Sequence, residues 1–172
     1  MKPSKCEFGM NKVRFLGHIV SEHGIQVNPE KIAEVEKFPT PKSVSDVRSF
    51  WSLCSFYRKF ISFFSKLAKP LNDLLQKGVK FEWLEKHESS FQDLKTKLIS
   101  APILGHFQYG KETKIHTHAC TYGVGAVLMQ WQNEGNKRVR KTIAYASRSL
   151  NKSERKYFVT ELECLAVVYG VV

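Results

Sequence analysis

The chain has 172 residues, of which 42% are hydrophobic and 25% are charged, a composition typical of a globular protein and not of a disordered one. Its 27 Lys and Arg against 16 Asp and Glu give a net charge of +11, which favours a nucleic-acid-binding surface, although ordinary solubility charge would give the same excess. No apolar run approaches the ~18 residues of a membrane span, and the N-terminus lacks the apolar core of a signal peptide.

The cysteines are spread along the chain without any C-x-x-C pair: Cys6, Cys54, Cys120 and Cys164. Each lies in an apolar or structured context, so we expect buried thiols and no disulfide framework. With neither a signal peptide nor a membrane span, this pattern predicts an intracellular protein.

The first part of the chain has the alternation of short strands. Residues 5–20 alternate apolar and polar side chains, and we expect two strands with a turn at 9–12 between them. A second turn at 22–24 then leads into a short extended segment at 25–27.

A short helix is predicted next, because Asn28 is a favourable N-cap and Pro29 a favourable first helical residue. Pro39 and Pro41 then enforce an extended linker. Ser43 caps the longer helix that follows. Residues at helical spacing form its expected core stripe: Val44, Val47, Trp51 and Cys54.

The same helix carries a second stripe, in which Arg48, Ser52 and Phe56 recur every four residues. A guanidinium can bind phosphate and an aromatic ring can pack on a ribose, so this stripe could face a nucleic acid. An ordinary solvated helix face would have the same spacing. If the stripe binds nucleic acid, we expect Lys59, which follows it closely, to contribute.

A further helix is expected over about 85–99, with Phe91, Leu94 and Leu98 on one face. From Lys114 the apolar period changes from 3.6 to 2, which predicts strands near 114–120, 124–132 and 139–147. A last helix is expected to begin near Ser153 or Thr160, with these residues on its inner side: Leu162, Leu165, Ala166 and Tyr169.

Residues 113–130, TKIHTHACTYGVGAVLMQ, resemble the first hairpin of the ribonuclease H domain in gypsy-class LTR-retrotransposon Pol polyproteins, where the pattern is close to TDAS-x-x-G-x-GAVL-x-Q. Other segments occur in the family's order. The resemblance to the end of the reverse-transcriptase palm is carried by KCEFGMNKVRFLGHIVSEHGIQVNPEKI. The resemblance to the thumb is carried by PKSVSDVRSFWSLCSFYRKFISFFSKLAKPLNDLL, and the resemblance to the connection by FEWLEKHESSFQDLKTKLISAPIL. The segment IAYASRSLNKSERKYFVTELECLAVV, like the hairpin at 113–130, resembles the first part of ribonuclease H.

The resemblance implies an α+β chain with four parts: palm-end hairpins and a short helix at 1–40, thumb-like helices at 41–78, a connection at 79–112, and a partial ribonuclease H-like domain at 113–172. The last part would have three antiparallel strands and a helix, without the C-terminal half of that fold. We therefore expect a fragment that could associate with the rest of a Pol polyprotein. The missing flanking strands would leave an open, apolar sheet edge.

The resemblance also implies a parent activity of RNA-directed DNA polymerase with ribonuclease H, and Mg²⁺ in the intact enzyme. Two-metal hydrolysis needs several carboxylates, and Mg²⁺ prefers oxygen ligands to imidazole. Glu163 matches the family's helix Glu, but His118 occupies the position of its first Asp. The only aspartates are Asp46, Asp73 and Asp93, which include no adjacent pair and lie before the ribonuclease-like part. We expect the chain to hold no metal or cofactor and to catalyse neither reaction, with Glu163 an ordinary, partly exposed helix carboxylate.

On the nucleic-acid side, the resemblance implies that the stripe faces a template–primer duplex, with Ser52 where the family has Gly. It also matches Phe15-Leu16-Gly17-His18 to the hairpin that holds the primer terminus. For the chain in isolation, an ordinary hairpin with one surface histidine is the favoured interpretation. Two alternatives to an inactive nucleic-acid-binding fragment stay open: a working part of a longer enzyme, and a domesticated nucleic-acid-binding module.

A zinc site at His116, His118 and Cys120 is a weaker hypothesis. Alternate residues of a strand point to one face, and two imidazoles with a thiolate can bind zinc. Ligands two apart on one strand are separated by about 7 Å, however, which is too far for one ion.

Overall fold

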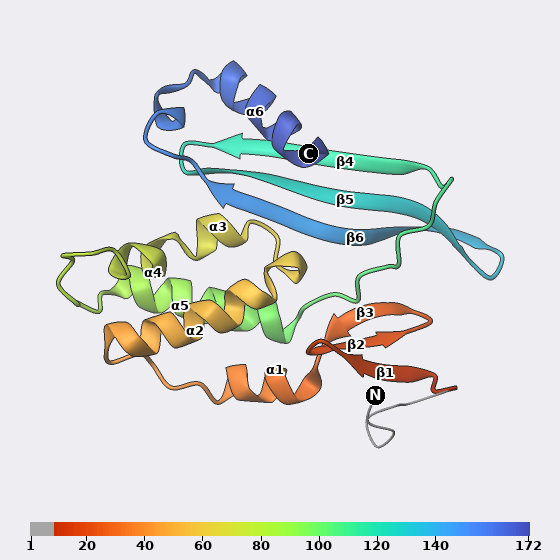
Figure 1. Ribbon diagram of the computed structural model, residues 1–172, viewed down its shortest axis with the longest axis horizontal. Helices are drawn as coiled ribbons and strands as arrows, with labels where there is room; N and C mark the ends of the chain where they lie inside the picture. The colour runs from red at the N-terminus through yellow and green to blue at the C-terminus, as the bar shows by residue number, and fades with distance from the viewer. Residues whose placement is uncertain (1–8) are drawn as a thin grey trace, which may run out of the picture.

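The computed structural model describes residues 9–172 and has three parts (Figure 1). A small sheet contains β1 (Lys12–Phe15), β2 (His18–Ser21) and β3 (Gly24–Val27). A helical block and then a larger sheet follow in chain order. The expected strand residue Phe8 and the expected buried thiol of Cys6 lie outside the described residues.

The small sheet is antiparallel in the order β1-β2-β3. Phe15 pairs with His18, so a two-residue loop, Leu16-Gly17, joins β1 to β2. Both loop residues have positive φ, 46° and 76°, as tight hairpin loops require. The strand expected before the turn at 9–12 lies outside the described residues, and that turn stays a prediction. The Leu16-Gly17 loop divides the second expected strand and was not predicted, because the alternation of apolar residues does not reveal which Gly closes a hairpin.

The helical block contains α1 (Pro29–Glu36), α2 (Val44–Phe56), the 3₁₀ turn η2 (Arg58–Phe60), α3 (Phe64–Leu67), α4 (Lys69–Leu74) and α5 (Glu85–Ile99). Both predicted N-caps are confirmed. Asn28 Oδ1 accepts from the Glu30 N–H at 3.1 Å, and Ser43 Oγ accepts from the Asp46 N–H at 3.2 Å. The helix expected over 85–99 is also confirmed, with Phe91, Leu94 and Leu98 fully buried.

The core of this block is aromatic. The ring of Phe50 lies 4.5 Å from that of Phe91 and 5.2 Å from that of Phe38. The buried residues of α2 are Val47, Phe50 and Cys54. Of the expected core stripe, Val44 and Trp51 are only half-buried. The buried face of α2 is rotated relative to the predicted one, because α2 packs through Phe50 against the aromatic face of α5. The residue spacing within α2 does not reveal that α5 is its packing partner.

The larger sheet contains β4 (Thr113–Cys120), β5 (Gly123–Glu134) and β6 (Lys137–Ser149), antiparallel in that order. After the 3₁₀ turn η3 (Glu154–Lys156), α6 (Val159–Val171) packs on β4 and β5. The helical block contacts β6 through α3 and η2 (Figure 1). The predicted α+β class, with three antiparallel strands and a helix at the end, is confirmed. So is the inner side of α6: Leu162 and Ala166 are buried, and Leu165 and Tyr169 pack against them.

The segment between α5 and β4 ties the two sheets together. Ile25 and Leu104 exchange two backbone hydrogen bonds of 2.8 Å, and the Gly105 N–H donates to the Thr142 carbonyl at 2.8 Å. The helical block is joined to β6 as well, because the Ser65 N–H donates to Ser147 Oγ at 3.0 Å. No helix within residues 9–172 is long and apolar enough to cross a membrane.

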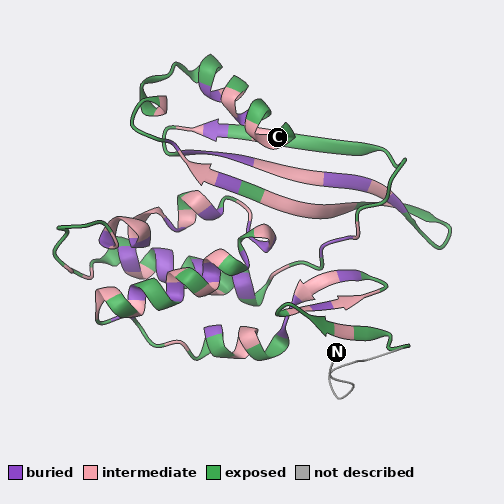
Figure 2. Cartoon of the chain, in the orientation of Figure 1, coloured by how far each residue is buried: buried purple, intermediate pink, exposed green. Residues whose placement is uncertain are grey.

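The free edge of the larger sheet is polar. Within the described residues β4 pairs only with β5, and its exposed positions include Lys114, His116 and His118. The expected open edge is present among residues 9–172, but its exposed side chains are mostly polar, with Ile115 the apolar exception. The exposed apolar surface lies next to it, on the outer side of α6 and the residue before it (Figure 2): Phe158, Val159, Val167, Val168 and Val171.

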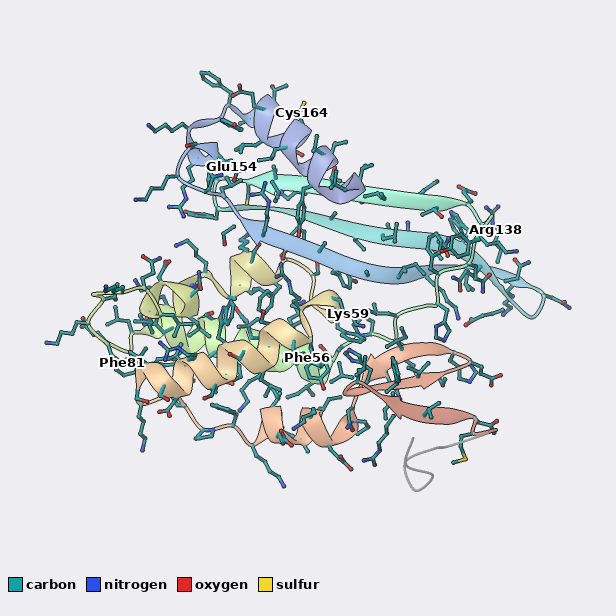
Figure 3. All side chains as sticks on the ribbon, viewed as in Figure 1. Phe56, Lys59, Phe81, Arg138, Glu154 and Cys164 are labelled. Carbon is teal, nitrogen blue, oxygen red and sulfur yellow. The ribbon has the colours of Figure 1, made fainter. Side chains whose placement is uncertain are left out.

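The cysteines differ in exposure. Cys54 is fully buried, and burial raises the pKa of its thiol strongly. Cys120 is half-buried and its thiol donates to the Gly123 carbonyl at 3.4 Å. Cys164 is exposed on α6 (Figure 3), so the expectation that it is buried is wrong. It lies on the outer side of α6, off the inner stripe that contains Leu162 and Ala166, and its apolar sequence context did not reveal this.

Candidate nucleic-acid interface and ribonuclease H-like site

The stripe predicted on α2 is solvent-exposed. Arg48, Ser52 and Phe56 all lie on the side of α2 that faces away from the Phe50 core. The ring of Phe56 is 55% exposed, which is unusual for a large aromatic residue on a helix. The stripe is therefore free to contact a ligand.

The hairpin that contains Gly17 and His18 docks on the C-terminal end of this stripe. The His18 ring stacks on Phe56, with centroids 5.3 Å apart and 15° between the planes. The Tyr57 hydroxyl donates to the Gly17 carbonyl at 2.8 Å. A Cβ at position 17 would lie 3.1 Å from the Phe56 ring, so Gly is needed for the close approach as well as for the positive φ.

His18 is half-buried in an aromatic setting, not a surface histidine. Its ring centroid lies 5.4 Å from that of Tyr57 and 5.6 Å from that of Phe60. Its Nδ1 is buried and has no hydrogen-bond partner among residues 9–172. Desolvation, and to a lesser degree the charge of Lys59, lowers the pKa of His18, so the packed ring is neutral near pH 7.

Lys59 lies in the turn η2 beside the hairpin (Figure 3). Its Nζ lies 5.4 Å from the centroid of the Phe60 ring, and burial lowers its pKa. The structure thus gathers Gly17, His18, Phe56 and Lys59 from segments about 40 residues apart. The hairpin tip adds the other two residues of the predicted Phe15-Leu16-Gly17-His18 segment: Phe15, 62% exposed, and Leu16, 75% exposed.

His118 and Glu163 also meet, at the free edge of β4. Nδ1 of His118 lies 3.6 Å from Oε1 of Glu163, and the same oxygen accepts from the Ala119 N–H at 3.3 Å. No three His, Cys, Asp or Glu side chains within residues 9–172 come close enough together to hold a metal ion, and this includes His116 and Cys120. The site offers one carboxylate and one imidazole, which is a poor match to Mg²⁺.

A pocket of about 280 Å³ lies beside His118, between the loop after η2 and the sheet. Phe63, from that loop, has a positive φ of 55° and meets the His118 ring edge-on, with centroids 6.1 Å apart. Positive φ is uncommon for an aromatic residue. The other wall of the pocket includes His116, Gly125 and Tyr145. This pocket could not be predicted from the sequence, because segments distant along the chain form it.

Comparison with models of known protein families shows which family the chain belongs to. The model for the RNase H-like domain found in reverse transcriptase matches residues 83–172. The chain belongs to this family. The matched region covers α5, all of the larger sheet and α6.

Two curated relatives extend the similarity to the remaining part of the chain. The retrovirus-related Pol polyprotein from transposon 412 of Drosophila melanogaster is 34% identical over 172 residues, which cover all of this chain and 14% of that protein. The transposon Tf2-3 polyprotein of Schizosaccharomyces pombe is 34% identical over 165 residues, 96% of this chain and 12% of that protein. The chain therefore corresponds to a small part of a transposon Pol polyprotein.

Solved structures agree on the fold. The foamy viral protease-reverse transcriptase in complex with an RNA/DNA hybrid aligns with a TM-score of 0.76 at 21% identity, over 94% of this chain and 21% of that chain. A complex of the foamy viral enzyme with double-stranded DNA aligns with a TM-score of 0.77 at 22% identity, over 93% of this chain and 28% of that chain.

Proposed function

We propose that the chain is a segment of a gypsy-class LTR-retrotransposon Pol polyprotein that binds duplex nucleic acid but does not hydrolyse it. In this proposal residues 1–40 are the palm end, 41–78 the thumb, 79–112 the connection and 113–172 the first part of ribonuclease H. The order of the three structural parts and the relatives named above support this division.

The observation that carries the binding proposal is the docking of the hairpin onto α2. It makes one surface, here called the thumb–hairpin surface, from Leu16, Gly17, His18, Arg48, Ser52, Phe56 and Lys59. Two cations can contact phosphates, and the exposed ring of Phe56 can pack on a ribose. Ser52 presents a small side chain between Arg48 and Phe56, which allows a backbone to approach closely. The net charge of +11 favours the same ligand.

The proposal that hydrolysis is lost depends on His118. An imidazole next to the single carboxylate of Glu163 cannot hold two Mg²⁺ ions about 4 Å apart, the arrangement that two-metal hydrolysis requires. The site therefore lacks the charge needed to activate water and to stabilise the leaving oxygen.

The test is fluorescence anisotropy with a labelled DNA duplex and a labelled RNA–DNA hybrid, over a range of salt concentrations. We expect Arg48→Ala and Lys59→Ala each to weaken binding and to reduce the slope of log affinity against log salt by about one. Lys80→Ala is the matched control, because Lys80 is exposed in the loop before α5 and outside the thumb–hairpin surface. Binding that is unaffected by salt, or weakened equally by the control, would disprove the proposed interface.

A second candidate is a working ribonuclease H whose missing carboxylates come from elsewhere in a longer chain or complex. It is favoured by the position of Glu163, which still reaches the edge of β4 beside residue 118. Incubation with an RNA–DNA hybrid and Mg²⁺ separates the two candidates. Cleavage that disappears in Glu163→Gln would support the enzyme and overturn the inactive interpretation.

A further inference from the structure

Tyr57, directly after α2, connects the end of this helix to the hairpin. We propose that Tyr57 is a positioning residue for the thumb–hairpin surface: its hydroxyl fixes the hairpin against α2 so that the two bind one duplex together. The inference rests on the proposed nucleic-acid binding. It concerns a residue that does not itself touch the ligand, since Tyr57 is only 1% exposed.

The anchor at the helix end is rigid. Tyr57 follows directly after α2, and its N–H donates to the Cys54 carbonyl at 3.2 Å. Its ring packs edge-on against Phe56, with centroids 4.8 Å apart, and lies 6.2 Å from Phe60. A ring held on both sides in this way fixes the direction of its hydroxyl group.

The hydroxyl acts on the hairpin at its tightest point. It donates to the carbonyl of Gly17 at 2.8 Å. Within residues 9–172 this is the only hydrogen bond between the β1–β2 hairpin and α2 or η2. The other contacts are aromatic packing of His18 on Phe56, Tyr57 and Phe60, which resists separation but has less directional preference than a hydrogen bond. The hydrogen bond therefore sets the register between the hairpin tip and the stripe.

The protonation state of Tyr57 suits this role. Desolvation, and to a lesser degree the charge of Glu34, raises the pKa of Tyr57 above its usual value. The phenol thus remains a hydrogen-bond donor at neutral pH, and the contact is not a pH switch.

A purely structural role for Tyr57 makes a different prediction. If the ring only fills the core, Tyr57→Phe preserves the packing and leaves duplex affinity unchanged. If the hydroxyl positions the hairpin, the same change frees the tip to move relative to Arg48 and Phe56. Part of the affinity is then lost to the cost of ordering the tip on binding.

The experiment measures duplex affinity of the full chain by anisotropy for Tyr57→Phe, Leu16→Ala and the double variant. Loss of one neutral hydrogen bond corresponds to about a three- to tenfold weaker Kd for Tyr57→Phe. The salt slope should stay unchanged, because no phosphate contact is removed, whereas Arg48→Ala lowers it. Tyr109→Phe is the control, since Tyr109 is 93% exposed and should bind as the unmodified chain does.

The double variant tests whether Tyr57 acts through the hairpin. Leu16→Ala should weaken binding less in the Tyr57→Phe background than alone, because the tip is no longer held in place. Amide exchange in the free chain should rise selectively across β1 and β2 in Tyr57→Phe, with α2 and α5 unchanged. Unchanged affinity, additive effects or unchanged exchange of the hairpin amides would each overturn the inference. Failure of the unmodified chain to bind a duplex would instead overturn the proposed function.

Discussion

Nδ1 of His118 lies 3.6 Å from Oε1 of Glu163, where β4 and α6 meet at the free edge of the larger sheet. A carboxylate at position 118 would face Glu163 at a similar distance, and a divalent cation would be needed to relieve the repulsion between them. With imidazole at that position the carboxylate has a compatible neighbour, and no cation is needed. The structure thus brings position 118 and Glu163 together, and the pair offers one imidazole and one carboxylate.

Restoring the carboxylate should restore a response to metal. We predict that His118→Asp lowers the melting temperature in the presence of a chelator, because two carboxylates then face each other, and that Mg²⁺ raises it again. The unmodified chain should show no such response. Thermal unfolding with and without Mg²⁺ measures both effects.

His116→Asp is the matched control for that experiment. It places the same carboxylate on the same strand, but about 7 Å along it and away from Glu163. If the control responds to Mg²⁺ as strongly as His118→Asp does, then general surface binding explains the effect and the site has no special geometry.

The aromatic core of the helical block should dominate stability. Phe50 is fully buried between Phe38 and Phe91, so Phe50→Ala should lower the free energy of unfolding by about 3–5 kcal/mol through lost burial and a cavity. Phe107→Ala, at a ring that is 47% exposed, should change it by less than about 1 kcal/mol. Urea denaturation followed by circular dichroism measures both values, and similar losses in the two variants would contradict this assignment of the core.

Local features of the sequence were sufficient to predict most of the secondary structure. The caps Asn28 and Ser43, the apolar face of α5 and the period-2 strands after Lys114 all depend on neighbouring residues, and all are confirmed. The features that failed depend on distant partners. Phe50 replaces Trp51 in the core because of where α5 lies.

The candidate sites show the same division. Sequence spacing identified the exposed stripe on α2, and the family pattern identified His118 and Glu163. Neither could show that the Tyr57 hydroxyl reaches Gly17, because 40 residues separate the two partners and each lies in an ordinary local pattern. Contacts of this kind follow from the packing of the whole chain and not from any one segment.

Acid should destabilise the chain through its packed histidines. His87 is buried, and its Nδ1 accepts from the Leu84 N–H at 2.9 Å, which requires the neutral ring. Desolvation first, and then the charge of Lys86, lowers the pKa of His87 below 6.5, and the pKa of His18 is lowered as well. The unfolded chain then binds more protons than the folded chain just below pH 6.5, so stability falls as the pH decreases through that value.

The measurement is the free energy of unfolding between about pH 7.5 and 5. His87→Gln should flatten the decline, whatever it does to stability at neutral pH. His23→Gln, at a side chain that is 69% exposed, should leave the decline as it is. A decline of equal slope in His87→Gln would mean that other groups control the acid response.

The outer side of α6 should drive self-association of the isolated chain. Val167, Val168 and Val171 are 51–71% exposed there, on a helix in which most residues are apolar. Helices of this kind are normally covered on both sides, and large exposed apolar patches promote association. Replacing Val168 and Val171 by Lys should therefore shift the chain towards monomer in sedimentation velocity experiments, with an unchanged circular dichroism spectrum.

Val79→Lys, at a loop valine that is 44% exposed, adds the same kind of charge elsewhere and should leave association unchanged. If that control is equally effective, net charge and not the α6 surface determines solubility. If the unmodified chain is monomeric at high concentration, the exposed valines are tolerated and the prediction is wrong.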